Sequence, residues 1–288
     1  MKSWKTTSNP HTKGTGRILM ITDTLNLSFR YKHNTRKPFA AELVSTIHSF
    51  AKSYGVTDVL ALSDKGKSVF RKELHPGYKG NREDKLALRT PEEIEADEQF
   101  FEYYKDAWEL CKATFPSFVY RGVEADDLAA VACRVLEPFY DEIWLLSSDG
   151  DWDTLLTEKV KRFSYKTRRE YTIETMYEEH GCDTPEQFAQ LKALQGDPGD
   201  GINGIDGIGT KRGYGLLREY GSALDIADAI PLPGKQKYIE NVNKSKELIE
   251  RNIQLVDLPT YCLEAVAAAG VLEEYIADIM KIGKGEQE

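Results

Sequence analysis

The sequence has few cysteines and histidines, and neither residue type is arranged as a metal-binding or disulfide motif. The cysteines lie far apart and include no C-x-x-C pair: Cys111, Cys133, Cys182 and Cys262. The five histidines are equally scattered. This pattern excludes a zinc site and a disulfide framework, and we expect the reduced, packed thiols of a cytosolic protein.

Long apolar runs are also lacking. No stretch approaches the length of about 20 apolar residues that a membrane-spanning helix needs, so we expect no membrane partner. Residues 1–16 are polar, carry Lys2, Lys5 and Lys13, and have no apolar core like that of a secretory signal. We interpret them as a flexible tail of a protein that works in the cytoplasm, that of a bacterial host if a phage encodes it.

An overall excess of basic charge is missing as well, because the formal net charge is −9. The basic residues are nevertheless concentrated in two stretches with interleaved aromatic residues. The first comprises Lys65, Lys67, Arg71, Lys72, Lys79, Arg82, Lys85 and Arg89, and the second Lys159, Lys161, Arg162, Lys166, Arg168 and Arg169. We interpret both as tracks for nucleic acid. The acidic segment Glu92–Glu109 is interpreted as a solvated helix face.

The apolar pattern predicts an α/β fold with a mostly parallel sheet. Strand-length runs at residues 18–21, 56–62, 118–120 and 143–146 alternate with segments of helical period at 40–54, after Thr90, and at about 124–136. Beyond about Thr184 the pattern becomes helical, including a helix over 210–220. We therefore predict a core at 17–183, with the basic excursion 65–95 outside the sheet, and a helical C-terminal region at 184–288.

Aspartates follow three of the predicted strands. Because ligands of open α/β sheets bind beyond the carboxyl ends of the strands, Asp23, Asp64 and Asp149 are expected in one crevice. One such aspartate alone is more often a turn or helix-cap residue. Further carboxylates lie in three short motifs, and the complete set is Asp23, Asp64, Glu124, Asp126, Asp127, Asp149, Asp151, Asp197 and Asp200.

These nine carboxylates predict a site for hard divalent ions. They would repel one another without cations between them, and oxygen-only ligands favour Mg²⁺ or Mn²⁺ over zinc. Their number also equals the excess of the 47 acidic residues over the 38 basic ones. Two ions roughly 4 Å apart are the usual arrangement for phosphodiester hydrolysis. Two other motifs are excluded. An EF-hand requires glycine where Thr154 stands and a bidentate glutamate where Val160 stands, and a P-loop requires glycine where Ala61 stands.

The motifs resemble those of the 5′-nuclease (flap endonuclease) superfamily, in particular its bacteriophage members. The resemblance rests on Glu124-Ala125-Asp126-Asp127, on the segment 148–156 and on matching segments across nearly the whole chain beyond the tail. It implies a PIN-like nuclease core, a helical arch over 65–95 and a C-terminal helix-hairpin-helix (helix-three-turn-helix) region. It also implies that the nine carboxylates form the metal cluster.

The resemblance implies roles for further residues. Lys79 would contact the scissile phosphate, Arg82 would support developing charge, and Tyr78 would stack on a base. The hairpin residues Gly204, Gly207, Gly209 and Lys211 would grip duplex DNA, with K⁺ bound there in some members. The sequence departs from the family at Thr24, where relatives usually have glycine, and at Gly201, where they usually have asparagine.

The function implied is hydrolysis of DNA near the junction of a 5′ single strand and duplex, leaving 5′-phosphate and 3′-hydroxyl ends. Flap, pseudo-Y and nicked DNA would be substrates of a monomeric enzyme active in DNA replication, and exonucleolytic trimming from 5′ ends would accompany cleavage. A PIN-class ribonuclease is the alternative, which a comparison of RNA and DNA substrates would decide. A non-catalytic junction binder would have lost carboxylates, and here none is missing.

Overall fold

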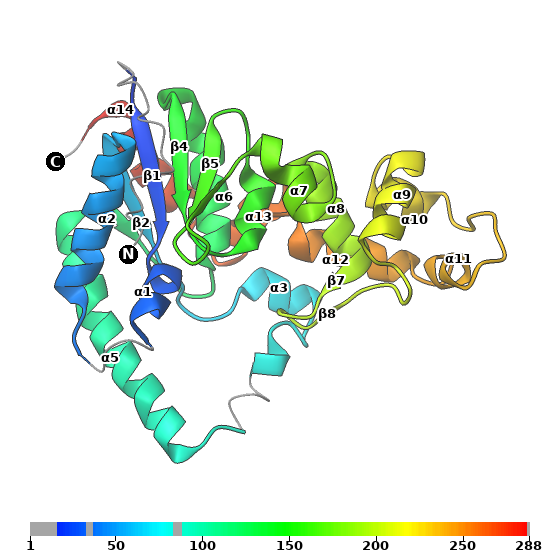
Figure 1. Cartoon of the computed structure of the whole chain (residues 1–288), viewed down its shortest axis with the longest axis horizontal. Helices are drawn as coiled ribbons and strands as arrows, with labels where there is room; N and C mark the ends of the chain where they lie inside the picture. Colours follow the sequence, from blue (N-terminus) through cyan, green and yellow to red (C-terminus); the bar gives the residue numbers. More distant parts are fainter. Residues whose placement is uncertain (1–15, 33–36, 83–87, 287–288) are drawn as a thin grey trace.

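The computed structural model describes residues 16–32, 37–82 and 88–286 (Figure 1). The predicted tail at 1–16 therefore lies almost wholly outside the described residues, as does part of the predicted arch. The centre of the molecule is a six-stranded sheet in the order β3-β2-β1-β4-β5-β6. Its strands are β1 (Ile18–Asp23), β2 (Asp58–Leu62), β3 (Ser117–Phe118), β4 (Glu142–Leu146), β5 (Val160–Ser164) and β6 (Arg169–Tyr171). Every pairing is parallel except that of β5 with β6, which confirms the predicted fold class.

Helices cover both faces of the sheet because alternate side chains of each strand point to opposite faces. Leu19 and Ile21 of β1 join one hydrophobic core with α6 (Ala125–Leu136). Met20, between them, joins the other core. The helices on that second face are α1 (Thr24–Lys32), α2 (Ala40–Tyr54) and α5 (Pro91–Thr114). Such two-sided burial explains why the central strands β1, β2 and β4 are nearly continuous apolar runs.

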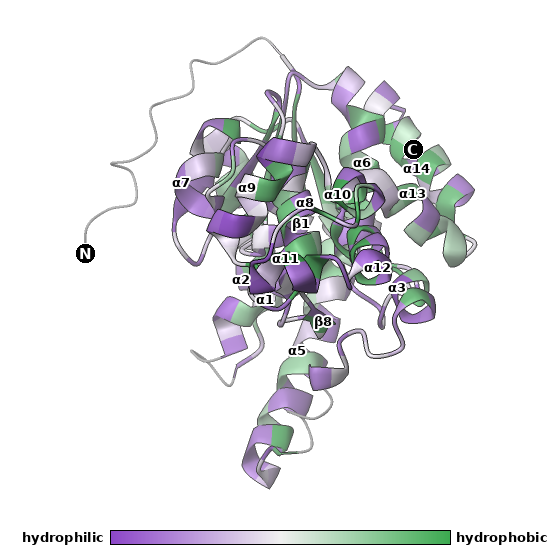
Figure 2. Cartoon of the chain, turned by 90° about the vertical axis from the view of Figure 1, so that its right-hand side faces the viewer, coloured by the Kyte–Doolittle hydropathy of each residue, from purple (hydrophilic) through white to green (hydrophobic). Residues whose placement is uncertain are grey.

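The helix starts follow the expected capping chemistry. At α5, the Thr90 hydroxyl accepts from the Glu93 amide while the Glu93 carboxylate accepts from the Thr90 amide, which satisfies two amides of the first turn. The N-terminal part of α5 stands away from the body of the molecule in both views (Figures 1 and 2). The short helix α3 (Val69–Leu74) lies on the opposite arm of the same excursion.

The C-terminal region builds a second core from its own helices, which Figure 1 shows to the right of the sheet. They are α8 (Pro185–Gln195), α9 (Thr210–Tyr220), α10 (Ala223–Asp228), α11 (Lys237–Val242) and α12 (Lys246–Val256). The small hairpin of β7 (Gly196–Asp197) and β8 (Ile202–Asn203) lies between α8 and α9.

The last two helices depart from the predicted division. α13 (Leu258–Ala268) and α14 (Leu272–Lys284) return to the sheet and pack against α6. Their buried residues, including Val266 and Ile279, belong to the same core as β1 and β2. The prediction of one helical region over 184–288 missed this, because an amphipathic pattern does not reveal which partner its apolar face meets.

The second predicted nucleic-acid track forms β5, the turn after it and β6, and the prediction is wrong for Arg162, which is buried, whereas Lys166, Arg168 and Arg169 are exposed. Arg162 is 3% exposed, and its guanidinium binds the buried Asp153 carboxylate through Nε and Nη2 at 2.5 and 2.7 Å. Lys161 is ion-paired with Glu142. The basic side chains break the apolar alternation of β5, so the strand was not recognised from the sequence. No helix within the described ranges is long and apolar enough to cross a membrane.

Candidate metal centre

Three aspartates gather at the carboxyl edge of the sheet, as predicted. Asp23 is the last residue of β1, Asp64 follows β2 by two residues, and Asp149 caps the 3-10 helix η3 (Gly150–Leu155) after β4. Each carboxylate is held by a backbone amide. The donors are Asn26 to Asp23 at 2.9 Å, Ala125 to Asp64 at 2.5 Å and Asp151 to Asp149 at 2.9 Å. The backbone of three separate elements therefore orients the carboxylates.

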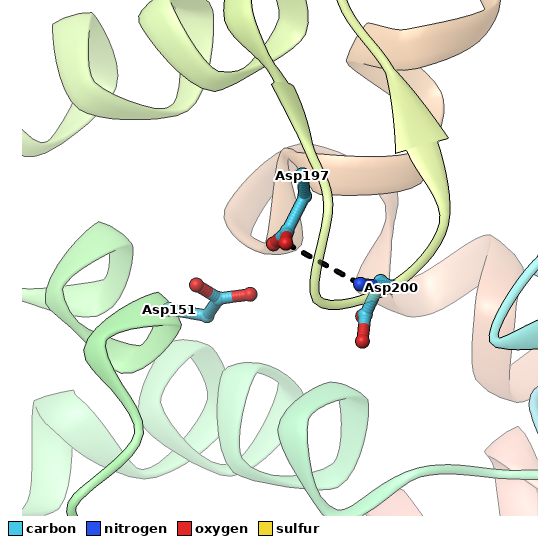
Figure 3. Close-up of side chains that lie close together, drawn as sticks. All are labelled: Asp151, Asp197 and Asp200. Carbon is cyan, nitrogen blue, oxygen red and sulfur yellow. Dashed lines mark hydrogen bonds between the residues drawn. The ribbon is translucent and has the colours of Figure 1, made fainter. Parts of the chain in front are cut away.

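A second group of aspartates meets across the gap between η3 and the β7–β8 loop. One oxygen each of Asp151, Asp197 and Asp200 lies within 4.8 Å of the others, and Figure 3 shows Asp151 opposite the loop that carries the other two. Asp197 also accepts from the Gly199 amide at 2.8 Å. The ammonium of Lys192, on α8, is ion-paired with Asp151 and lies 2.9 Å from Asp197. Lys192 therefore supplies one positive charge beside two of these three aspartates.

The N-terminus of α6 contributes Glu124 and Asp126 between the two groups. Glu124 accepts from the Lys79 ammonium and from the Tyr78 hydroxyl, both at 2.8 Å. Asp126 accepts from the Trp152 indole at 2.6 Å. A small cavity lies beside the second group, and its lining includes Asp126, Asp151, Asp197 and Asp200 together with Arg71 and Tyr78.

Asp127 differs from the other predicted ligands. Its side chain is fully buried, and its two oxygens accept from the Arg71 guanidinium at 2.5 and 2.8 Å. Arg71 also donates from Nε to the carbonyl of Leu255 on α12 at 2.9 Å. A bidentate ion pair of this kind uses the oxygens that a metal would need. The structure thus places Asp127 in an internal ion pair instead of the open cluster.

The predicted basic residues lie where the excursion meets the metal centre. Lys79 is 8% exposed, adopts φ +53°, and donates its amide to the Asp200 carbonyl at 2.7 Å. Arg82 is half-exposed and lies 2.7 Å from the Asp200 carboxylate. Gly201 has φ +73°, and a Cβ there would lie 3.2 Å from the Gly77 carbonyl. This close approach explains why a small residue fits at one of the two departures from the family pattern.

Tyr78 does not lie where a DNA base could stack on it. The side chain is 2% exposed, and its hydroxyl donates toward Glu124 at 2.8 Å and Asp200 at 3.1 Å. The prediction of a stacking role is therefore wrong for this conformation. The tyrosine instead joins the base of the excursion to both carboxylate groups.

The carboxylates of the cluster differ in how much positive charge lies near them. Burial, and then neighbouring carboxylates, raise the pKa of Asp23 and Asp126 well above the usual range and also raise the pKa of Asp149. Burial alone would raise the pKa of Glu124, but the cations Lys79 and Arg71 outweigh it and lower that pKa. Several carboxylates in the centre thus lack enough positive charge nearby, and a divalent cation fits this donor set.

The predicted duplex-binding hairpin precedes α9. Gly207 has φ +83° and is exposed, Gly209 caps α9 without a side-chain hydrogen bond, and Lys211 is exposed in the first turn. Gly204 has a different reason for being glycine, because a Cβ there would overlap the Gln195 carbonyl at 1.8 Å. The hairpin tip is therefore an accessible backbone surface, and Gly204 serves the packing beneath it.

Comparison with known proteins agrees with this geometry. Two family models match, described as the 5′-3′ exonuclease N-terminal resolvase-like domain over residues 19–181 and the 5′-3′ exonuclease C-terminal SAM fold over 183–274. The chain belongs to the 5′-3′ exonuclease family. It is 60% identical to the flap endonuclease of Escherichia phage T5 over 271 residues, 93% of each chain. It is 31% identical to DNA polymerase I of Streptococcus pneumoniae, covering 78% of this chain but 25% of that protein.

Solved structures of the phage T5 protein match the whole 5′-3′ exonuclease fold. A complex of that flap endonuclease with DNA and metal ions has a TM-score of 0.91 at 59% identity, covering 93% of this chain and all of that one. A structure of the T5 5′-exonuclease with bound zinc ions has a TM-score of 0.90 at 60% identity, with the same coverage. These matches confirm the predicted family and architecture.

Two buried cations at the carboxylate centre of this 5′-3′ exonuclease were not recognised as such from the sequence. Arg71 was one member of a basic run, and Lys192 lies in the last turn of α8 without a motif around it. Both are buried and balance carboxylates of the centre. Their spacing from those carboxylates, such as 56 residues between Arg71 and Asp127, carries no local signal.

Proposed function

We propose that this chain is a divalent-metal-dependent DNA 5′-nuclease that cuts near junctions of a 5′ single strand and duplex. The observation that carries the proposal is the placement of a buried ammonium, Lys79, between Glu124 and Asp200 at the rim of the carboxylate cluster. A phosphodiester is an anion that needs cations on both sides of the reacting phosphorus. The products would carry 5′-phosphate and 3′-hydroxyl ends.

The metal ligands of this proposal fall into two groups. Asp23, Asp64, Glu124, Asp126 and Asp149 would hold ions at the sheet edge, and Asp151, Asp197 and Asp200 would hold ions at the β7–β8 loop. Mg²⁺ or Mn²⁺ suits these oxygen donors. Bound ions would supply charge neutralisation and activation of the attacking water. Asp127 would instead position Arg71, whose ion pair and backbone contact tie α3 to α6 and α12.

Lys79 and Arg82 would contribute fixed positive charge. Both now contact carboxylate oxygens of Asp200, so a phosphate arriving at the centre would exchange one anionic partner for another. Burial would make the attraction of Lys79 to that phosphate strong, as it does for its present partner Glu124, because a desolvated ammonium binds an anion more strongly than a hydrated one. Arg82, being half-exposed, would act at the entrance.

The hairpin before α9 would bind duplex DNA. Its exposed backbone at Gly207 and Gly209, the uncapped N-terminus of α9 and Lys211 favour phosphate contacts that do not depend on base sequence. A K⁺ ion at this hairpin is part of the proposal. We also propose a monomer acting in the cytoplasm of a bacterial host during DNA replication, with the domain division near residue 184 except that α13 and α14 belong with the sheet.

A substrate panel tests the function. The full chain is incubated with Mg²⁺ and 5′-labelled flap, pseudo-Y, nicked, blunt and all-RNA flap substrates. Cleavage of the flap and pseudo-Y DNA near the junction, with much slower cleavage of the RNA flap, is the expected result. Equal or faster cleavage of the RNA flap would instead support a ribonuclease, and no cleavage of any branched DNA would refute the proposal.

A further inference from the structure

A buried chain of hydroxyl groups joins α5 to the residues beside two of the aspartates. The Tyr104 hydroxyl on α5 lies 2.8 Å from the Thr24 hydroxyl and 2.6 Å from the Ser63 hydroxyl. Thr24 directly follows Asp23, and Ser63 directly precedes Asp64. All three hydroxyl residues are buried. One tyrosine therefore contacts the neighbours of both aspartates.

The direction of the hydrogen bonds is determined by the last acceptor. Thr24 donates its only hydroxyl proton to the Leu62 carbonyl at 2.7 Å. The Tyr104 hydroxyl must therefore donate to Thr24, and Ser63 must donate to Tyr104. Each hydroxyl in the chain donates once, and the ends of β1 and β2 are fixed relative to each other. Loss of the central hydroxyl would take the acceptor from the buried Ser63 hydroxyl and the donor from Thr24, which would keep its bond to Leu62.

We propose that Tyr104 and Thr24 are positioning residues that set the placement of Asp23 and Asp64 for metal binding. The proposal rests on the proposed function of those aspartates as ligands. It gives Thr24, where the family usually has glycine, a specific purpose, since glycine has no hydroxyl to complete the chain. Because Tyr104 lies on the helix whose N-terminal part stands away from the body (Figures 1 and 2), it also ties the metal centre to the position of α5.

The test compares Tyr104→Phe with Tyr31→Phe as a matched control. The Tyr31 hydroxyl also contacts a threonine, Thr46, at 2.9 Å, but this contact joins α1 to α2, and Thr46 is not next to an aspartate in the sequence. Mn²⁺ affinity is measured by calorimetry on the full chain, and the Mg²⁺ concentration for half-maximal flap cleavage is measured in parallel. Orienting partners of metal ligands typically change affinity by about tenfold or more.

We expect Tyr104→Phe to weaken Mn²⁺ binding and raise the Mg²⁺ requirement by about tenfold, with Tyr31→Phe near wild type. Thr24→Val should behave like Tyr104→Phe, and Thr24→Ser should restore most of the affinity because it keeps the hydroxyl. Wild-type Mn²⁺ affinity in both Tyr104→Phe and Thr24→Val would overturn the inference, as would Thr24→Ser binding no better than Thr24→Val. If wild type binds Mn²⁺ but cuts no branched DNA, the proposed function fails, whereas the calorimetric comparison still decides this inference.

Discussion

Replacing Arg162 by methionine should destabilise the protein strongly. The guanidinium makes two hydrogen bonds to Asp153 and a third to the Ser147 carbonyl at 3.1 Å, and its Cζ lies 4.0 Å from the Tyr171 ring centre. Asp153 is itself fully buried. Without Arg162, Asp153 would keep, among the described residues, only the His180 ring nitrogen, 2.8 Å away, as a charged or polar side-chain partner, and breaking a buried ion pair costs about 3–5 kcal/mol.

That magnitude is large enough to separate two roles for Arg162. At roughly 2–4 °C per kcal/mol for a chain of this size class, the melting temperature should fall by about 6–20 °C. An exposed DNA-contacting arginine would behave differently. Its loss would lower the slope of log affinity against log salt by about one and leave stability nearly unchanged. Thermal unfolding and salt-dependent DNA-binding measurements on the same variant therefore distinguish them.

Two control variants refine this experiment. Lys112→Met removes an exposed ion pair with Glu109 and should change stability by less than about 1 kcal/mol. Combining Arg162→Met with Asp153→Leu should recover much of the lost stability, because both buried charges are then absent. A single variant Arg162→Met with wild-type melting and a reduced salt slope would refute the internal role of Arg162.

Two further predictions concern the metal centre. The pKa of Asp23, Asp126 and Asp149 is raised above the usual 3.8 in the folded state, so the folded protein binds protons more tightly than the unfolded chain. The free energy of unfolding of the metal-free protein should therefore fall as pH rises from about 4 through those raised pKa values. Mg²⁺ should raise the melting temperature more at pH 8 than at pH 5, because the carboxylates are then ionised. An equal increase in melting temperature at both pH values would contradict this prediction. Gly201→Val should cost about 1–3 kcal/mol and slow cleavage, because β-branched side chains rarely adopt the φ of +73° found there. Gly201→Asn should lose less in melting and cleavage assays, because asparagine tolerates this backbone region better; similar losses in both variants would contradict the backbone explanation.

The parts of the fold that follow local rules could be predicted from the sequence. Thr90 with Glu93 is a capping box in both the sequence and the structure, and the helix over 210–220 has the predicted bounds. The meeting of Asp23 with Asp149 follows from parallel strands ending at one edge. Each of these inferences needs only a few neighbouring residues or one topological rule.

The remaining features depend on partners far apart in sequence. β5 was missed because Lys161 and Arg162 read as surface charges, and only the fold shows that Arg162 meets Asp153. The burial of Tyr78 depends on the β7–β8 loop, which folds against the base of the excursion. Periodicity also cannot show that α13 and α14 return to the sheet, because an apolar helix face has the same pattern whichever core it enters.

The central claim is that the carboxylate cluster binds the divalent ions required for DNA cleavage. The most direct measurement is single-turnover cleavage of a 5′-labelled flap by the full chain in Mg²⁺, in excess chelator, and with Asp149→Asn in Mg²⁺. We predict cleavage near the junction by the wild type in Mg²⁺, none in chelator, and a loss of about 100-fold or more in Asp149→Asn. Cleavage that persists in chelator, or that survives Asp149→Asn unchanged, would contradict the account.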